Sequence, residues 1–147
     1  MSEYEILYSA LNLSHEDFSG LFSNKAEAEM LRPELESVIE ISERLIKPQG
    51  IISIFDAVEV NVDGFRVEDV YFECGRKIAG LLRGSEKIAV FVCTIGAEIV
   101  SAYKRSTASG DWLRAYFFDT LGSLAVERTM DIIQKQLKKE LSENNLR

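Results

Sequence analysis

The sequence predicts an α+β fold in which helices pack around an antiparallel or mixed β-sheet, with a long central helix near the C-terminus. Two observations predict it. Apolar residues recur at helical spacing over 24–46 and 112–141, and the segment between these ranges has the patterning of strands. With 147 residues, 46% of them apolar, the chain is long enough to bury its own core. We therefore expect one domain over 1–147, with N-terminal helices at 1–47, a hairpin, helix and buried strand at 50–95, and C-terminal helices at 97–141.

The N-terminal part is predicted to be helical. Residues 3–11 fit a short helix, because one side of it would carry Ile6, Leu7, Ala10 and Leu11. A longer helix is expected over 24–46, with Asn24 as its N-cap. Pro33 lies inside this range and predicts a break or a restart of the helix there.

The apolar pattern changes at Ile51. The segment 51–60 is rich in β-branched residues and roughly alternating, and Val62-Asp-Gly-Phe65 is a turn signal, so a β-hairpin is predicted. Residues 73–82 read as a helix that ends before Gly84. Residues 87–94 form an almost wholly apolar strand, a pattern typical of a strand that is covered on both faces.

The last helix, expected over 112–141, carries the strongest pattern. It follows a helix that starts at Ala97, from which Gly110-Asp111 separates it. Between Trp112 and Val126 it is apolar on nearly all sides, so we expect it to cross the middle of the fold with Trp112 buried. Gly122 and Ser123 are small, which predicts that another element passes close to the helix there.

Charge and composition exclude several classes of protein. Residues 1–40 hold nine acids against Lys25 and Arg32, so all of the net charge of −7 lies there. An acidic surface repels phosphate backbones, which argues against nucleic acid as a partner. The acidic region reads as a solvated helix face or as a patch that docks a basic protein surface. The longest apolar run is too short to span a membrane and the N-terminus has no basic leader, so we expect a cytoplasmic protein that does not contact a membrane.

The chain offers few residues for metal or nucleophilic chemistry. Cys74 and Cys93 are expected to be small core residues, because one histidine and two separated cysteines do not make a zinc site. His15 is interpreted as a surface or helix-start residue. The sequence contains no Gly-x-Gly-x-x-Gly after a strand, no Walker loop and no Gly-x-Ser-x-Gly, so nucleotide-fold and triad enzymes have no support.

A polar line runs along the last helix. Asp119, Ser123, Glu127 and Asp131 recur every four residues and so lie on one face. Two interpretations stay open. The first two residues lie where the helix is otherwise apolar, so part of the line faces a cleft in which a carboxylate binds a ligand ammonium. Alternatively, the line is a solvated edge whose acids pair with Arg128 or Lys135.

Gly96 is a second candidate for ligand contact. It lies in the strand-to-helix turn Cys93-Thr-Ile-Gly-Ala-Glu98, where glycine allows the backbone to approach a ligand and where free amides at the helix start meet anions. By itself, a glycine at such a junction is more often only a turn.

Two segments together resemble a known family. These are Phe91-Val-Cys-Thr-Ile-Gly-Ala-Glu98 and Gly110-Asp-Trp-Leu-Arg-Ala-Tyr-Phe-Phe-Asp-Thr-Leu-Gly-Ser-Leu-Ala-Val-Glu127. They are similar to the activation (reactivation) domain of cobalamin-dependent methionine synthase, especially its stand-alone bacterial type, and the likeness extends more loosely to the rest of the chain. The resemblance implies an accessory protein that binds S-adenosylmethionine and assists reductive methylation of cob(II)alamin. The cobalamin is then carried by a partner, a methionine synthase or another corrinoid protein.

The resemblance also implies site residues. Glu127 matches a glutamate that contacts the ligand in that family, and Asp119, Ser123 and Gly96 are the other expected cofactor-binding residues. No catalytic residue and no metal site are expected, so the chain is not a catalyst by itself. The family's Arg-x-x-x-Gly-Tyr motif does not occur in this sequence, which predicts weak or absent binding of S-adenosylmethionine by the chain alone. The alternative is a non-catalytic module that dimerises or docks on a corrinoid protein. A homo-oligomer is compatible with both functions.

Overall fold

The computed structural model describes residues 1–56 and 59–143. In chain order the elements are β1 (Ser2–Glu5), η1 (Tyr8–Leu11), η2 (His15–Leu21), α1 (Lys25–Leu45), β2 (Gln49–Asp56), β3 (Glu59–Val60), β4 (Gly64–Val67), β5 (Val70–Glu73), α2 (Gly75–Leu82), β6 (Lys87–Thr94), α3 (Glu98–Ala108) and α4 (Trp112–Glu143), where η marks 3-10 helices. The chain divides into two compact units, one of 1–3 and 51–92 and the other of 4–50 and 93–147. It passes from one unit to the other within β1, within β2 and within β6.

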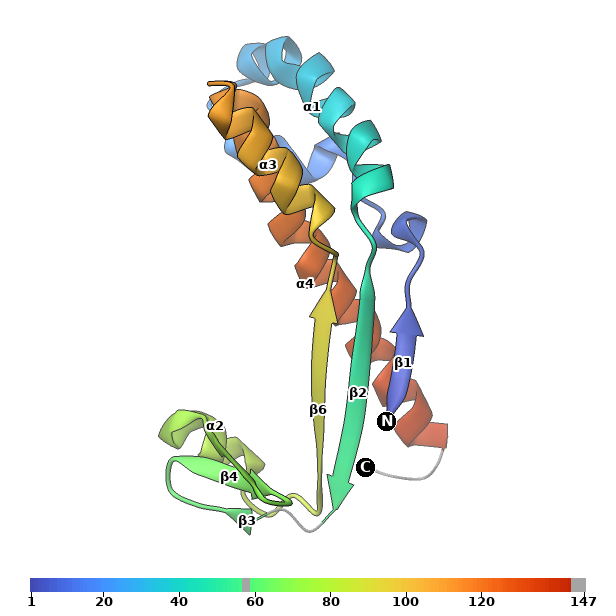
Figure 1. Ribbon diagram of the computed structural model, residues 1–147, viewed down its shortest axis with the longest axis vertical. Helices are drawn as coiled ribbons and strands as arrows, with labels where there is room; N and C mark the ends of the chain where they lie inside the picture. The colour runs from blue at the N-terminus through green and yellow to red at the C-terminus, as the bar shows by residue number, and fades with distance from the viewer. Residues whose placement is uncertain (57–58, 144–147) are drawn as a thin grey trace. The chain divides into compact units, whose positions relative to one another are not determined.

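The predicted fold class is confirmed. The described part of the chain combines helices with two three-stranded sheets, in the orders β1-β2-β6 and β3-β4-β5, and α4 is the long C-terminal helix. Figure 1 shows β2 running opposite to both β1 and β6, so the first sheet is antiparallel. The second is antiparallel as well, with β4 between β3 and β5.

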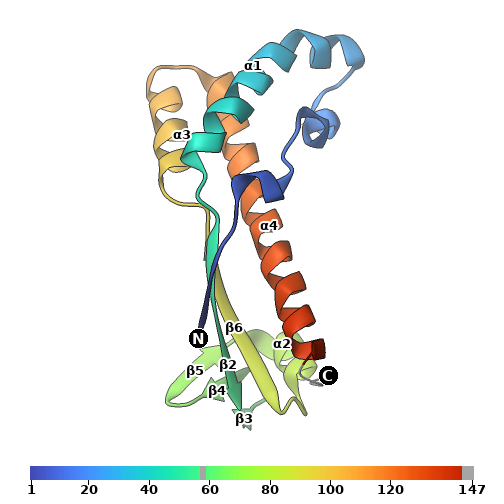
Figure 2. The same cartoon turned by 90° about the vertical axis from the view of Figure 1, so that its right-hand side faces the viewer.

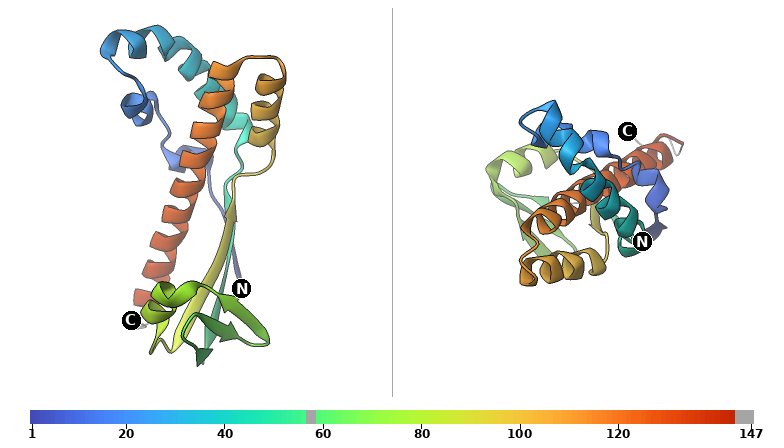
Figure 3. Two further views of the ribbon diagram at one scale, coloured as in Figure 1. Left: turned by 90° about the vertical axis from the view of Figure 1, so that its left-hand side faces the viewer. Right: turned by 90° about the horizontal axis from the view of Figure 1, so that it is seen from above.

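The unit of 1–3 and 51–92 contains the predicted turn, where Val60 pairs with Phe65. The predicted first strand over 51–60 is only partly correct, because Glu59–Val60 alone pairs across this turn and Gln49–Asp56 forms β2 of the other sheet. β5 adds a third strand that we did not predict, and the ring of Phe72 stacks on that of Phe65 at 5.0 Å between centroids. Phe65, Val67 and Ile88 form the buried core of this unit. The left view of Figure 3 shows α2 beside this small sheet.

The unit of 4–50 and 93–147 is helical and built around α4. Both α3 and α1 pack against α4, and Figure 2 shows α1 crossing it near its N-terminal end. The rings of Phe18 in η2 and Phe117 in α4 meet edge to face at 6.3 Å between centroids. The largest fully buried apolar side chains of the molecule lie in this unit and are those of Phe18, Phe117, Leu11, Leu35, Leu121, Ile133 and Val38.

Helix α1 begins as predicted but does not break. The backbone N–H of Glu27 donates to Oδ1 of Asn24 at 2.9 Å, which is the expected N-cap. The prediction of a break or restart at Pro33 is wrong, since α1 continues from Lys25 to Leu45. Pro33 lies on the exposed side, where water can satisfy the carbonyl that loses its partner, while Leu35 and Val38 on the opposite side hold the helix against the core.

Two further predictions are corrected. Residues 2–5 form β1 instead of the first part of a helix, because they pair with β2, and only Tyr8–Leu11 forms a short 3-10 helix. Strand β6 has the predicted bounds but is not covered on both faces, since Val92 is 70% exposed and only Ile88 is fully buried. Cys74 and Cys93 are half-buried and not core residues.

The prediction that Trp112 is buried is also wrong. Trp112 is 68% exposed, and Leu113, Tyr116 and Val126 are exposed too, so the apolar stretch of α4 is buried on one side only. That side carries Phe117, Phe118, Leu121 and Ala125. Helices α3 and α1 pack against α4. Among the described helices, none is both long and apolar enough to cross a membrane.

Candidate ligand cavity between helices α3 and α4

The polar line on α4 forms as the spacing predicts. Asp119, Ser123, Glu127 and Asp131 are all exposed, and they follow each other at successive turns of one continuous helix. The proposed pairing of these acids with Arg128 does not occur. The Arg128 guanidinium instead donates to the carbonyl of Leu11 at 2.7 Å and also reaches the Asn12 carbonyl and the Asp17 carboxylate.

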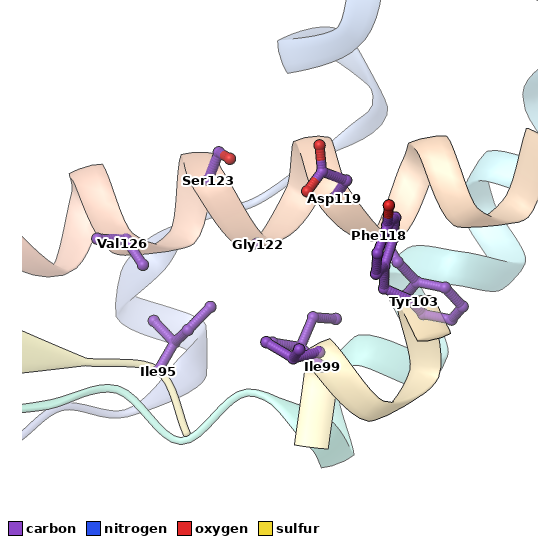
Figure 4. A pocket seen from close by; sticks show the side chains of 9 residues that line it. Ile95, Ile99, Tyr103, Phe118, Asp119, Gly122, Ser123 and Val126 are labelled. Atoms are coloured by element: carbon purple, nitrogen blue, oxygen red, sulfur yellow. The ribbon is translucent and has the colours of Figure 1, made fainter. Parts of the chain in front are cut away.

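Part of this line borders a cavity of about 350 Å³ between α3 and α4. Figure 4 shows Ile95 and Ile99 opposite Gly122 of α4, with Asp119 and Ser123 on the same helix. The lining residues are Ile95, Ile99, Val100, Tyr103, Phe118, Asp119, Gly122, Ser123 and Val126. The structure thus brings two of the four predicted ligand-contacting residues, Asp119 and Ser123, to one cavity.

Gly122 of α4 lies against Ile99 of α3 and Ile95 of the turn that precedes α3. It is buried, and a Cβ built on it would lie 3.7 Å from Cγ1 of Ile99 and 3.8 Å from Cδ1 of Ile95. The predicted close contact is therefore confirmed for Gly122, whereas Ser123 is exposed and takes no part in it. Gly110 allows the chain to reverse between α3 and α4, because its φ of +79° suits glycine.

The end of the cavity nearest the start of α4 is aromatic. Tyr103 of α3 and Phe118 of α4 both line the cavity (Figure 4). The Phe118 ring is also held by the Arg114 guanidinium at 5.9 Å, and Arg114 pairs with Glu34 of α1 at 2.9 Å. The sequence reasoning did not identify Tyr103. The available signal was its helical spacing from Ile99, which places both side chains on the face of α3 that meets α4.

The cavity lining holds two ionisable side chains, the carboxylate of Asp119 and the phenol of Tyr103. No ion pair or hydrogen bond engages the Asp119 carboxylate within residues 1–56 and 59–143. An exposed carboxylate next to an apolar, partly aromatic hollow is suited to an organic cation, which gains both charge pairing and contact with the rings. The lining has no arginine or lysine for an anionic group. Among the described residues, no group of three His, Cys, Asp or Glu side chains is placed to hold a metal ion.

Glu127 and Gly96 lie outside this lining. Glu127 is exposed and follows Asp119 by eight residues, a separation of about 12 Å along the helix axis. Gly96 lies in the turn between β6 and α3 with a φ of +82°, and its N–H donates to Oγ1 of Thr94 at 3.1 Å. The carbonyl of the preceding residue, Ile95, also makes a structural hydrogen bond, because it accepts from the N–H of Lys47 at 2.8 Å. The amide of Gly96 is thus already used within its own turn.

Comparison with known proteins finds a match among the solved structures. No protein-family model matches the sequence, and no curated protein matches it. The fold is similar to a crystal structure of the MetH reactivation domain bound to AdoHcy, with a TM-score of 0.67 over 94% of this chain at 15% sequence identity. The match covers 55% of that chain, so the present sequence spans about half its length. The chain therefore has the fold of a MetH reactivation domain.

Proposed function

We propose that this chain is a reactivation-domain-like accessory of a cobalamin-dependent methionine synthase, and that it binds S-adenosylmethionine and its product S-adenosylhomocysteine. The observation that carries the proposal is the fold, which resembles that of a domain solved with AdoHcy. The cavity between α3 and α4 adds independent support, since its carboxylate and aromatic end suit a ligand with an ammonium and a sulfonium.

In this proposal Asp119 pairs with the ammonium of the ligand, while Ser123 donates or accepts a further hydrogen bond one turn away. Tyr103 and Phe118 contact the apolar part of the ligand. Glu127 is a second carboxylate on the same helix and would address a cationic group that extends along α4 beyond the cavity. The residues of this chain bind and orient the ligand, and the cobalamin of the partner supplies the cobalt chemistry.

The ligand carboxylate has no cationic partner in the cavity lining. A charge-assisted hydrogen bond contributes about 1.5–3 kcal/mol, so each one that is missing weakens binding by roughly tenfold or more. We therefore expect the isolated 147-residue chain to bind AdoHcy weakly, and a cobalamin-carrying partner to improve the affinity if it contributes the missing cation.

The test is a calorimetric titration of AdoHcy and of S-adenosylmethionine into the chain, with and without a cobalamin-dependent methionine synthase. Asp119→Asn should weaken binding by about tenfold. The matched control is Asp131→Asn, an exposed carboxylate on the same helix three turns further on, which should have no effect. Equal affinity for the wild type and Asp119→Asn would remove Asp119 from the site. Absence of binding in the presence and absence of the partner would refute the proposed function.

A second candidate function is a docking module that binds no ligand. It is favoured by the exposed apolar residues at the start of α4, where Trp112 is 68% and Tyr116 is 49% exposed, next to Leu113. Exposed aromatic clusters of this kind frequently anchor protein interfaces. In this case the wild-type chain should not bind AdoHcy, and Trp112→Ala should abolish its co-migration with a corrinoid protein on gel filtration. Unchanged co-migration would argue against this role.

A further inference from the structure

A second cavity lies between η2 and the first half of α1, and it is lined by residues of the N-terminal part of the sequence. Its volume is about 390 Å³, within the range of small-molecule sites. All its lining residues belong to the helical unit of 4–50 and 93–147. They are His15, Glu16, Ser19, Phe22, Lys25, Ala28, Glu29, Arg32 and Leu35. We call this hollow the α1 cavity.

The α1 cavity has an apolar wall. Phe22 follows η2 and is half-buried, and Ala28 and Leu35 come from the face of α1 that turns toward the core. Leu35 is 1% exposed and so forms a fixed floor. The packing of η2 against α1, with Phe18 fully buried, holds this wall in place. The wall can accept an aliphatic or aromatic group of a ligand.

Arg32 is held at one edge of the cavity by two contacts. Its Nε donates to Oε1 of Glu36 at 2.8 Å, and one terminal nitrogen lies 2.6 Å from Nε2 of His15. A guanidinium can only donate, so Nε2 of His15 accepts in this contact. These contacts use Nε and one terminal nitrogen, so the other terminal nitrogen keeps its donors for a ligand carboxylate.

The cavity also offers two carboxylates. Glu16 makes no ion pair within the described residues, and Glu29 is 3.8 Å from Nζ of Lys25, which is beyond hydrogen-bond distance. The lining thus carries two carboxylates, Glu16 and Glu29, and the two cations of Lys25 and Arg32, so these charges balance although residues 1–40 as a whole are strongly acidic. A balanced pair of signs beside an apolar wall is complementary to a ligand that itself carries both signs.

We infer that the α1 cavity binds a zwitterionic small molecule with an apolar body, of the class of free α-amino acids with a large apolar side chain. The ligand carboxylate meets Arg32, its ammonium meets Glu16, and its side chain lies against Phe22 and Leu35. No covalent step is involved. The inference does not depend on the cavity between α3 and α4, because the two cavities share no residue.

The experiment titrates L-phenylalanine into the full chain and follows binding by calorimetry or by ligand-observed NMR. Two analogues separate the charges: phenethylamine lacks the carboxylate, and N-acetyl-L-phenylalanine lacks the ammonium. We expect each to bind at least tenfold more weakly than L-phenylalanine. Equal binding of phenethylamine would show that Arg32 does not hold a carboxylate and would overturn the inference. Absence of binding by all three compounds would overturn it as well.

Two variants locate the site. Arg32→Gln should weaken binding of L-phenylalanine at least tenfold, because it removes the partner of the ligand carboxylate. Glu16→Gln should weaken it at least tenfold as well, because it removes the partner of the ligand ammonium. Arg44→Gln is the matched control, since Arg44 is exposed in the last turn of α1 and does not line the cavity. An equal loss in Arg44→Gln would mean that binding is an unspecific charge effect. L-phenylalanine should not displace AdoHcy, so failure of one proposal leaves the other intact.

Discussion

Gly122→Ala tests the contact between α3 and α4 most directly. The new Cβ would lie 3.7 Å from Ile99 and 3.8 Å from Ile95, which is ordinary van der Waals contact, so the interface has room for one methyl group. Replacing glycine by alanine inside a helix gains about 0.8–1.0 kcal/mol in helix propensity. Burying one further carbon adds up to about 0.8 kcal/mol. We therefore expect the free energy of unfolding to rise by about 1–1.5 kcal/mol.

The assay is urea unfolding followed by circular dichroism. With a slope of about 1–3 kcal/mol/M, a gain of this size raises the urea midpoint by roughly 0.3–1.5 M, and it raises Tm by several °C, at about 2–4 °C per kcal/mol. Gly80→Ala is the control, because Gly80 is helical and exposed and its added Cβ would meet nothing within 4 Å. That variant should gain the propensity term alone.

A lower urea midpoint in Gly122→Ala, with an unchanged slope, would refute the reasoning, because it would show that α3 leaves no space for a methyl group. Gly122→Leu adds three carbons beyond a Cβ that already touches Ile99 and Ile95, so it should overpack the interface. The expected cost is about 1–3 kcal/mol. Together the two variants show whether the space between α3 and α4 at position 122 admits one methyl group but not a leucine side chain.

Three further outcomes are expected. The fluorescence of Trp112 should be red-shifted and readily quenched by iodide in the native state, since it is 68% exposed; a blue-shifted, protected emission would contradict this. Arg128→Ala should lower the free energy of unfolding by roughly 2 kcal/mol, because it removes charge-assisted bonds that tie α4 to the N-terminal segment; an unchanged urea midpoint would oppose it. Burial, and secondarily the charge of Glu43, raise the pKa of Tyr8 above 10.0 in the folded state. The stability that Tyr8 contributes should therefore be complete below pH 10 and lost as the pH rises through its folded pKa. Ionisation of tyrosine, followed by the absorbance at 295 nm as the pH is raised, checks this.

The sequence determined the local features of this protein. Strand β6 has the predicted bounds, α1 begins at the predicted cap, and the hairpin turns at the predicted residues. These features depend on interactions within a few residues: the Asn24 side chain satisfies an amide of its own helix, and a run of β-branched residues favours extended backbone. The i+4 spacing likewise placed Asp119 and Ser123 on one face of α4 before any packing was known.

The tertiary structure alone decided which surfaces are covered. Burial of an apolar side chain depends on whether another element packs on its side, and composition does not contain that information. Trp112 and Val92 are exposed for this reason, although their neighbours are apolar. Residues 2–5 became a strand because β2 offered a partner for their backbone. The same holds for the candidate site, since Ile99, Tyr103 and Asp119 line one cavity because α3 packs against α4.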